Sequence, residues 1–141
     1  FNEYELKGVP IRIEIGPKDL EKNQIVLVRR DNLKKETVKI TQLNKKIEKT
    51  LNEIHNNMYD KAKKFLYENI KEVKNINDLK KVVSEGKIAK MNWCLGAKCE
   101  EIIKEKTESK SLVISLTEKS KGKCFVCNNK ASGVAFFAKS Y

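Results

Sequence analysis

The sequence predicts a mixed α/β protein with three parts: an α/β segment, one long helix and a small α+β domain. Three observations lead to this architecture. Apolar and polar residues alternate near the start of the chain, which is the period of strands. From residue 43 the apolar residues recur every three or four positions, which is the period of a helix. Four cysteines then fall in two short-range pairs. We expect the parts to cover residues 1–42, 43–76 and 77–141.

The first part contains three predicted strands. The first strand covers residues 9–15 and ends at Gly16 and Pro17. Its apolar face holds Val9, Ile11, Ile13 and Ile15, and its polar face holds Arg12 and Glu14. Residues 18–23 form a turn or a single helical turn, and 25–28 are apolar on both faces, which is typical of a central strand. A shorter third strand would bury Val38 and Ile40.

A long amphipathic helix is predicted from residue 43 onward. Its apolar stripe consists of Leu43, Ile47, Leu51, Ile54, Met58, Ala62, Phe65 or Leu66, and Val73. Thr41 is a suitable N-cap, and the asparagines at 75 and 77 break the pattern. We expect the stripe to pack on the sheet and on the following domain, with a coiled coil as the alternative. His55, the only histidine, is expected on the helix surface.

The last part alternates short helices and strands. A helix is predicted over residues 78–85, with Asn77 as its N-cap and Gly86 at its end. A strand follows at 88–93, then a short helix around 100–103 and a strand at 111–116.

The cysteines have the spacing of a structural metal site. Cys94 and Cys99 form a C-x4-C pair, Cys124 and Cys127 form a C-x2-C pair, and 24 residues separate the pairs. Tetrahedral zinc takes four such thiolates, and a site closed by four protein ligands is structural and not catalytic. Two disulfides or unliganded thiols are the alternatives, and disulfides are the weaker account in a reducing cytosol.

The charge balance points to a polyanionic partner. The formal net charge is +11, so RNA binding is one interpretation, and a merely solvated basic face is the other. The longest apolar runs are far shorter than the roughly 18 residues of a membrane span, and Phe1 does not begin a signal peptide. We therefore expect a soluble, cytoplasmic fragment of a longer protein. It has no nucleotide-binding glycine motif and no catalytic triad, so the chain is not expected to do catalysis alone.

Several segments resemble the C-terminal part of prolyl-tRNA synthetases of the archaeal and eukaryotic type. Residues 5–20 (ELKGVPIRIEIGPKDL) and 26–31 (VLVRRD) are similar to the family's class II anticodon-binding domain. The similarity continues into the family's C-terminal zinc-binding domain at residues 94–101, 103–107, 124–127 and 137–141. Asn128 stands where the family usually has Gly and would need a left-handed backbone, which Asn tolerates.

The resemblance implies an enzyme, proline–tRNA ligase, that activates proline with ATP and charges tRNA(Pro). ATP and Mg would bind in a class II catalytic domain that precedes this fragment, and the parent enzyme would be a homodimer. By position, the readers of the two anticodon guanines would be Glu5, Arg12, Lys18 and either Lys34 or Lys35, since lysines donate to guanine and carboxylates accept from it. The carboxylate of the terminal Tyr141 would approach the active site.

Two other classes of function stay open at this stage. One is a non-enzymatic zinc-ribbon adaptor that binds RNA or a protein. The other is a thiol redox domain that uses Cys124 and Cys127, although the pair lacks the strand-to-helix setting of such motifs.

Overall fold

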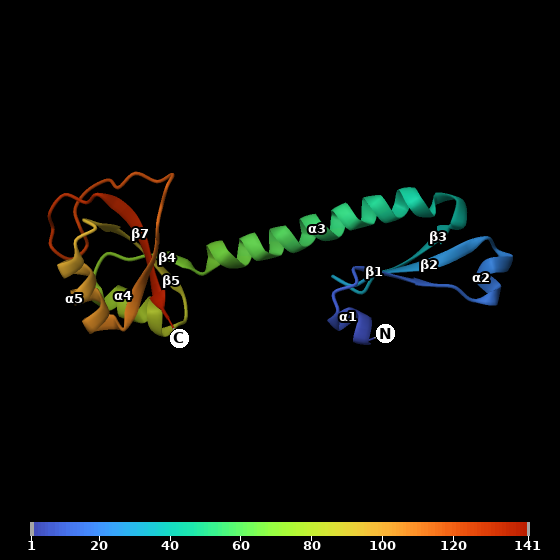
Figure 1. Ribbon diagram of the computed structural model, residues 1–141, viewed down its shortest axis with the longest axis horizontal. Coiled ribbons are helices and arrows are strands. Elements are labelled where there is room, and N and C mark those ends of the chain that lie inside the picture. Colours follow the sequence, from blue (N-terminus) through green and yellow to red (C-terminus); the bar gives the residue numbers. More distant parts are fainter. Residues whose placement is uncertain (1, 141) are drawn as a thin grey trace. The chain divides into compact units, whose positions relative to one another are not determined.

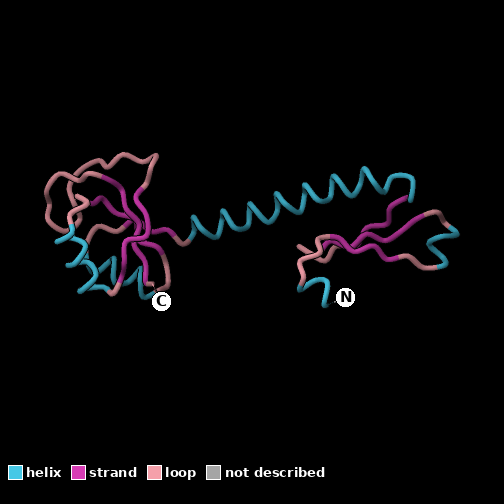
Figure 2. The backbone as a smooth tube through the Cα atoms, viewed as in Figure 1, coloured by secondary structure: helices cyan, strands magenta, loops and turns pink. Residues whose placement is uncertain are grey.

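The computed structural model describes residues 2–140 and forms two compact units, Phe1–Lys64 and Phe65–Tyr141, here called the N-terminal and the C-terminal unit. Each unit contains its own β-sheet, and a single long helix runs through the boundary between them (Figures 1 and 2). The predicted fold class, mixed α/β with a long helix, is confirmed.

The N-terminal unit is built on a three-stranded antiparallel sheet of order β1-β2-β3. Helix α1 (Asn2–Leu6) precedes β1 (Ile11–Glu14), and α2 (Pro17–Glu21) connects β1 to β2 (Gln24–Arg29). β3 (Lys35–Lys39) returns along the other side of β2. The run 25–28 is thus a central strand, as predicted. Figure 1 shows α1 and α2 at opposite ends of the sheet.

One face of this sheet packs on the start of the long helix. The core consists of Ile25, Leu27 and Val38, with Ile11, Leu43 and Ile47 packed against it. The predicted apolar face of the first strand is only partly correct, because Val9, Ile13 and Ile15 are exposed. Leu43 and Ile47 of the helix pack against the central and third strands, whereas β1 contributes only Ile11 to this cluster.

The third strand and the N-terminal cap of the long helix differ from the predictions. β3 begins at Lys35 and ends at Lys39, and a 3-10 turn, η1 (Ile40–Gln42), follows it. Ile40 is therefore exposed outside the strand, and Thr41 lies inside η1, so Thr41 is not a helix N-cap. The 3-10 turn provides the backbone bonds that a capping side chain would otherwise make.

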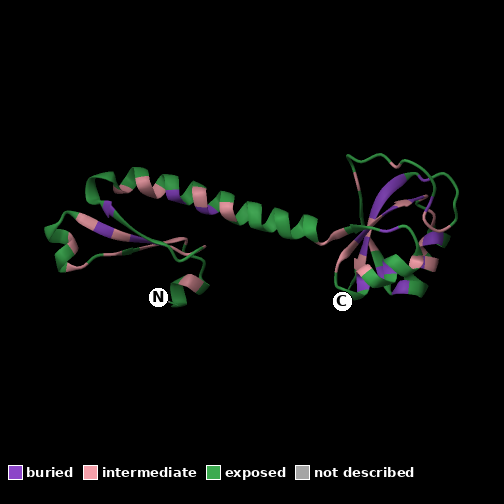
Figure 3. Cartoon of the chain, turned by 180° about the vertical axis from the view of Figure 1, so that it is seen from behind, coloured by how far each residue is buried: buried purple, intermediate pink, exposed green. Residues whose placement is uncertain are grey.

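Helix α3 (Leu43–Glu68) is shorter and less covered than its apolar pattern predicts. Its buried residues are Thr50 and Ile54, and every residue of 58–68 is exposed (Figure 3). The 26 residues of the helix span roughly 39 Å, whereas the six residues of β2 span about 20 Å. The helix is therefore longer than the sheet that it covers. His55 is exposed, as predicted.

The C-terminal unit has a four-stranded sheet of order β4-β5-β7-β6. β4 (Ile70–Glu72) runs parallel to β5 (Ile88–Trp93), and the other pairs are antiparallel. β6 (Ser109–Ile114) is an edge strand with a bulge between Ser111 and Val113, and β7 (Gly133–Lys139) is central. The prediction for β5 is correct at both ends. β6 begins and ends two residues earlier than predicted, and β4 and β7 are strands that the residue pattern does not predict.

Helices α4 (Ile76–Ser84) and α5 (Ala97–Thr107) supply apolar side chains to the core of this unit. The N-cap of α4 is Asn75, whose Oδ1 accepts a hydrogen bond from the amide of Asp78, so the prediction of Asn77 as the cap is wrong by two residues. The core consists of Val73, Leu79, Val83, Ala89, Met91, Trp93, Cys99, Ile103, Cys124, Ala135 and Phe137. Val73 belongs to this core and not to the long helix. No helix among residues 2–140 is long and apolar enough to cross a membrane.

Candidate metal centre and nucleic-acid interface

The four cysteines come together at one end of the C-terminal sheet. Cys94 follows β5 directly, and Cys99 lies in the first turn of α5. Cys124 and Cys127 lie in a turn between β6 and β7, and a bridge between Lys123 and Lys130 closes that turn. The pairing of β5 with β7 brings the two sequence-distant pairs to the same place.

The thiol geometry suits a single metal ion. All four sulfurs lie within 4.8 Å of one another. The Cys94 Sγ is 3.5 Å from that of Cys99 and 3.8 Å from that of Cys127. Metal–sulfur bonds of about 2.3 Å in a tetrahedron place the sulfurs about 3.8 Å apart. The separations exceed by far the ~2.05 Å of a disulfide, and all four cysteines are unbridged. The cluster could therefore hold a metal ion.

The surroundings of the sulfurs shift the pKa values of Cys99 and Cys124 in opposite directions. Burial raises the pKa of the Cys99 thiol to about 12. Burial also disfavours the Cys124 thiolate, but backbone amides of Cys127, Val126 and Cys94 donate to its sulfur, and the net result lowers the pKa of Cys124 to about 6. Amide donors around a sulfur stabilise the thiolate form that a metal requires.

Two unusual backbone conformations shape the cysteine turns. Asn128 has φ +58°, so the left-handed conformation predicted for it is confirmed. Its amide donates to the carbonyl of Cys124 at 3.1 Å, which closes the turn. Leu95 is also left-handed, with φ +62°. A Cβ at the next residue, Gly96, would lie 3.2 Å from the Cys94 sulfur, so a side chain there would require that sulfur to shift by a few tenths of an ångström.

In the N-terminal unit, charged side chains form a connected row on the sheet face opposite α3. Arg12 donates to Glu5 at 2.8 Å and to Glu14 at 3.0 Å. The second carboxylate oxygen of Glu14 accepts from Lys35 at 3.1 Å. Lys35 and Arg12 together hold the pKa of Glu14 below its usual range. Strand register explains the row, since Arg12 and Lys35 are the two cross-strand neighbours of Val28.

A second charged group joins the sheet to α3. Arg29 donates to Asp31 at 2.9 Å and to Glu53 of the helix at 2.8 Å, and Asn57 donates to the same Asp31 carboxylate. The Asp31 side chain is only 2% exposed. The hydrogen bond from Arg29 is the main cause of the lowered pKa of Asp31. This network holds the carboxylate in its charged form.

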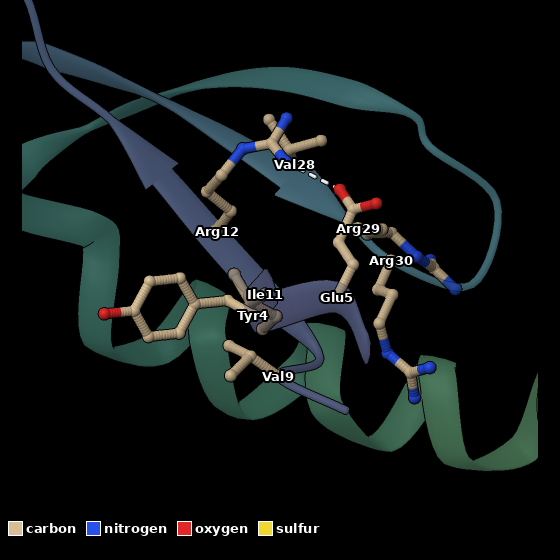
Figure 4. Close-up of a pocket in the computed structure, with 8 residues that line it drawn as sticks. All are labelled: Tyr4, Glu5, Val9, Ile11, Arg12, Val28, Arg29 and Arg30. Carbon is tan, nitrogen blue, oxygen red and sulfur yellow. Dashed lines mark hydrogen bonds and ion pairs between the residues drawn. The ribbon is translucent and has the colours of Figure 1, made fainter. Parts of the chain in front are cut away.

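A hollow of about 340 Å³ lies between α1, β1 and the end of β2 (Figure 4). Apolar side chains line it, and Glu5, Arg12, Arg29 and Arg30 contribute the charged groups. Figure 4 shows the Glu5 carboxylate directed at Arg12, whereas the Arg30 side chain extends the other way. A flat, partly polar group such as a nucleobase could contact the exposed Tyr4 ring and the guanidinium groups here.

The sequence-predicted RNA-binding residues do not form one cluster. Glu5, Arg12 and Lys35 are joined through Glu14. Lys34 is exposed in the β2–β3 turn, where its amide donates to the Asn32 side chain. Lys18 lies in α2, at the other end of β1 from α1, a separation of about 13 Å along the four-residue strand. Tyr141 lies outside the described residues.

Sequence reasoning missed Glu14 and Tyr4 as parts of this site. The signal for Glu14 is present in the sequence, because residues two apart on a strand share a face and Arg12 is itself a predicted RNA-binding residue. The signal for Tyr4 was absent, because it lies in a five-residue helix whose position against β1 depends on the fold.

Comparison with known proteins relates both units to one family. A family model described as "Prolyl-tRNA synthetase, C-terminal" matches residues 76–141, and one described as "Anticodon binding domain" matches residues 1–50. Both units match the C-terminal region of prolyl-tRNA synthetases. The resemblance found in the sequence is thereby confirmed.

Individual prolyl-tRNA synthetases and proline–tRNA ligases match nearly the whole chain. Proline–tRNA ligase 2 of Bacillus cereus (strain ZK / E33L) is 42% identical over all of it, and the Oceanobacillus iheyensis proline–tRNA ligase is 39% identical. The crystal structure of Cryptosporidium parvum prolyl-tRNA synthetase with halofuginone and AMPPNP is 36% identical over 99% of the chain, with a TM-score of 0.92. The chain spans about 30% of the length of each of these relatives.

Proposed function

We propose that this chain is the anticodon-recognising and C-terminal part of a proline–tRNA ligase, which activates proline with ATP and esterifies it to tRNA(Pro). The observation that carries the proposal is the charged row Glu5–Arg12–Glu14–Lys35 beside the hollow of the N-terminal unit, on a chain whose first 50 residues match an anticodon-binding domain. The row offers guanidinium, ammonium and carboxylate groups within one face, which is the donor and acceptor set that guanine edges require.

In this proposal the basic residues donate hydrogen bonds to RNA and the acidic residue accepts them. Arg12 and Lys35 donate to the O6 and N7 acceptors of a guanine, and Glu5 accepts from its Watson–Crick edge. These charges pair with one another without RNA, so the anticodon must replace some of their ion pairs. Lys18 and Lys34 would contact RNA outside the hollow. We propose that residues 1–42 are the second half of an anticodon-binding domain, that residues 43–76 are a connecting segment, and that residues 77–141 are a zinc-binding domain.

We further propose that the cysteine cluster holds one structural zinc ion. Four thiols fill a tetrahedral shell and leave no position for a substrate. The spacing of the sulfurs and the amides around Cys124 support the assignment. Elemental analysis of the purified chain should find about one equivalent of zinc. Less than a tenth of an equivalent of any metal, with an unchanged fold, would contradict it.

The remaining partners belong to the parent protein. ATP, Mg and proline would bind in a catalytic part not contained in these 141 residues, and the parent would act as a cytoplasmic homodimer. If the parent protein ends at Tyr141, its terminal carboxylate would help to order the proline or adenylate pocket, since a carboxylate accepts strong charge-assisted hydrogen bonds. Deleting residues 140 and 141 from the full-length protein should lower proline activation without loss of metal.

The anticodon assignment is tested in the full-length protein with two variants and their matched controls. Glu5→Gln should weaken tRNA(Pro) charging, and Glu3→Gln, in the same helix, should not. Lys35→Gln is paired in the same way with Lys39→Gln of the same strand. Each lost base contact is expected to lower charging about 5- to 150-fold, equivalent to about 1–3 kcal/mol.

The readout must separate the RNA step from the chemistry. Proline-dependent ATP–pyrophosphate exchange, which needs no tRNA, should stay at the wild-type level in Glu5→Gln and Lys35→Gln. Equal losses in exchange and in charging would show that these residues support the fold and do not read the anticodon.

A further inference from the structure

A second hollow lies on the C-terminal unit, between β4, β5 and the loop that follows β6. Its volume is about 430 Å³, and its lining is mostly polar. The charged residues around it are Glu72, Lys74, Lys90, Glu118, Lys119 and Lys121. It lies on the sheet face of Lys90 and Asn92, because the alternate residues of β5, Ala89, Met91 and Trp93, point into the core.

The lysines around the hollow differ in whether they form ion pairs. Lys90 binds Glu118 at 2.5 Å and Glu72 at 3.6 Å, so one lysine engages both carboxylates. Lys74, Lys119 and Lys121 are exposed, and no ion pair joins them to an acidic group within residues 2–140. Four cations and two anions leave a net charge of +2 around the hollow.

The loop that carries two of these lysines is held in place by its neighbours. The Ser115 hydroxyl accepts from the amide of Glu118 at 3.0 Å, and Ser120 donates to the carbonyl of Ala131 at 3.0 Å. The carbonyl of Gly122 accepts from the amide of Ala131 at 3.1 Å. The loop backbone is thereby anchored to the segment that joins the second cysteine pair to β7. Lysines on an anchored backbone lose less conformational freedom on binding than lysines on a mobile tail.

The floor of the hollow contains both apolar and amide groups. Val134, the cross-strand partner of Asn92, provides apolar surface, and Asn92 provides a side-chain amide. Such a floor suits a sugar ring, while the unpaired ammonium groups at the rim suit the phosphates on either side of it. The combination favours a sugar–phosphate backbone over a polypeptide with isolated carboxylates.

We propose that this lysine-rimmed hollow binds the sugar–phosphate backbone of tRNA through Lys74, Lys119 and Lys121, as a contact of the C-terminal unit that is independent of nucleotide sequence. The proposal rests on the proposed function only in naming tRNA as the RNA that the protein meets. The contact adds affinity and the anticodon site adds selectivity, since phosphate contacts position an RNA and base contacts specify it.

The test compares two triple variants of the whole chain that lose the same charge. Lys74→Gln/Lys119→Gln/Lys121→Gln removes the rim of the hollow. Lys80→Gln/Lys81→Gln/Lys106→Gln removes three exposed lysines from α4 and α5 in the same unit. Binding of a tRNA(Pro) transcript is measured from about 50 to 200 mM salt, and the fluorescence of Trp93, the only tryptophan, checks that the unit remains folded.

The rim variant should bind tRNA(Pro) about ten-fold or more weakly at the lower salt. The slope of log affinity against log salt should become shallower by about 2, because each lost phosphate contact removes about 0.7. The helix variant should change affinity less than about two-fold. Equal losses in both variants, or none in the rim variant, would overturn the proposal, as would competition by poly-glutamate as strong as that by RNA of equal charge.

A tRNA with altered anticodon guanines distinguishes this proposal from the proposed function. The rim variant should lose the same factor for both tRNAs and keep the wild-type ratio between them. A wild-type ratio of one would count against anticodon reading and leave the rim contact standing, whereas a rim effect confined to tRNA(Pro) would overturn the rim contact alone.

Discussion

Among residues 2–140, the buried apolar cluster of the N-terminal unit holds three aliphatic side chains, whereas that of the C-terminal unit holds eleven residues. The N-terminal unit adds a buried ion pair between Arg29 and Asp31, and the C-terminal unit adds four thiols within one cluster. Small units with limited cores commonly depend on such additional stabilisers. The N-terminal unit thus supplements a small apolar cluster with a buried ion pair, while the C-terminal unit has a larger apolar cluster and, in our proposal, a metal.

The largest expected effect is that of Cys124→Ser on the C-terminal unit. The Cys124 side chain is almost fully buried, and a structural zinc site contributes on the order of 10 kcal/mol to the folding of a small domain. The variant should lose its metal and the native emission of Trp93, and Ser120→Ala should lose neither. Native emission and an unchanged thermal midpoint in Cys124→Ser would show that the core suffices alone.

The next effect tests the core of the same unit. Phe137 is fully buried and packs edge-on against Trp93 at 5.5 Å, so Phe137→Ala should cost about 3–5 kcal/mol. Urea unfolding followed by Trp93 fluorescence measures it. Phe136, on the opposite face of the strand and only partly buried, is the matched control and should cost less. If the two substitutions lowered the free energy of unfolding by similar amounts, burial would not be the main source of stability in this unit.

In the N-terminal unit the critical substitution is of a charge. Asp31→Ala leaves Arg29 without its buried partner and should cost about 3 kcal/mol, whereas Glu53→Ala, at the exposed end of the same network, should cost at most about 1 kcal/mol. Hydrogen exchange of the β2 amides reports the stability of this unit. If the β2 amides exchange at the same rate in the two variants, the buried Asp31 carboxylate contributes no more to stability than the exposed Glu53 carboxylate.

The lowered pKa of Asp31 predicts that the N-terminal unit loses stability as the pH falls. The pKa of Asp31 is lower in the folded protein than the ~3.9 of an unfolded chain, so the unfolded state takes up the proton first as the pH falls. The stabilisation is complete above about pH 5 and is lost as the pH drops through the lowered folded pKa. β2 exchange should therefore accelerate in acid, and Asp31→Asn should flatten that dependence. An unchanged profile in Asp31→Asn would assign the response to other groups.

The smallest effect concerns the backbone of the cysteine turn. Asn128 is left-handed, so Asn128→Ala should cost about 1 kcal/mol, and Asn128→Gly should cost nothing or stabilise slightly. Unfolding followed by Trp93 measures both. An alanine variant as stable as the glycine variant would show that the turn relaxes without loss.

Periodicity was sufficient for the elements that lie in continuous patterns. The central strand at 24–29, the strand at 88–93 and the start of the long helix follow from residue spacing alone. The cysteine spacing likewise predicted a cluster that the fold brings together. These features depend on short segments of the sequence and can therefore be predicted from the sequence alone.

The missed features depend on tertiary context. β4 has three residues, too few for a pattern, and it exists because it pairs with β5. The exposed stripe at Met58 and Phe65 cannot be recognised without the length of the sheet beneath the helix. The link from Arg12 to Lys35 through Glu14 follows from strand register, which spacing within a single strand does not specify.

The bulge in β6 bears on how the protein behaves at high concentration. Leu112, Val113 and Ile114 are exposed in succession on an edge strand, an arrangement that favours strand-by-strand aggregation. The bulge between Ser111 and Val113 interrupts the regular spacing of amides and carbonyls along that edge. An incoming strand from another molecule therefore finds no continuous ladder to extend, and the apolar edge is kept from acting as a template for fibrils.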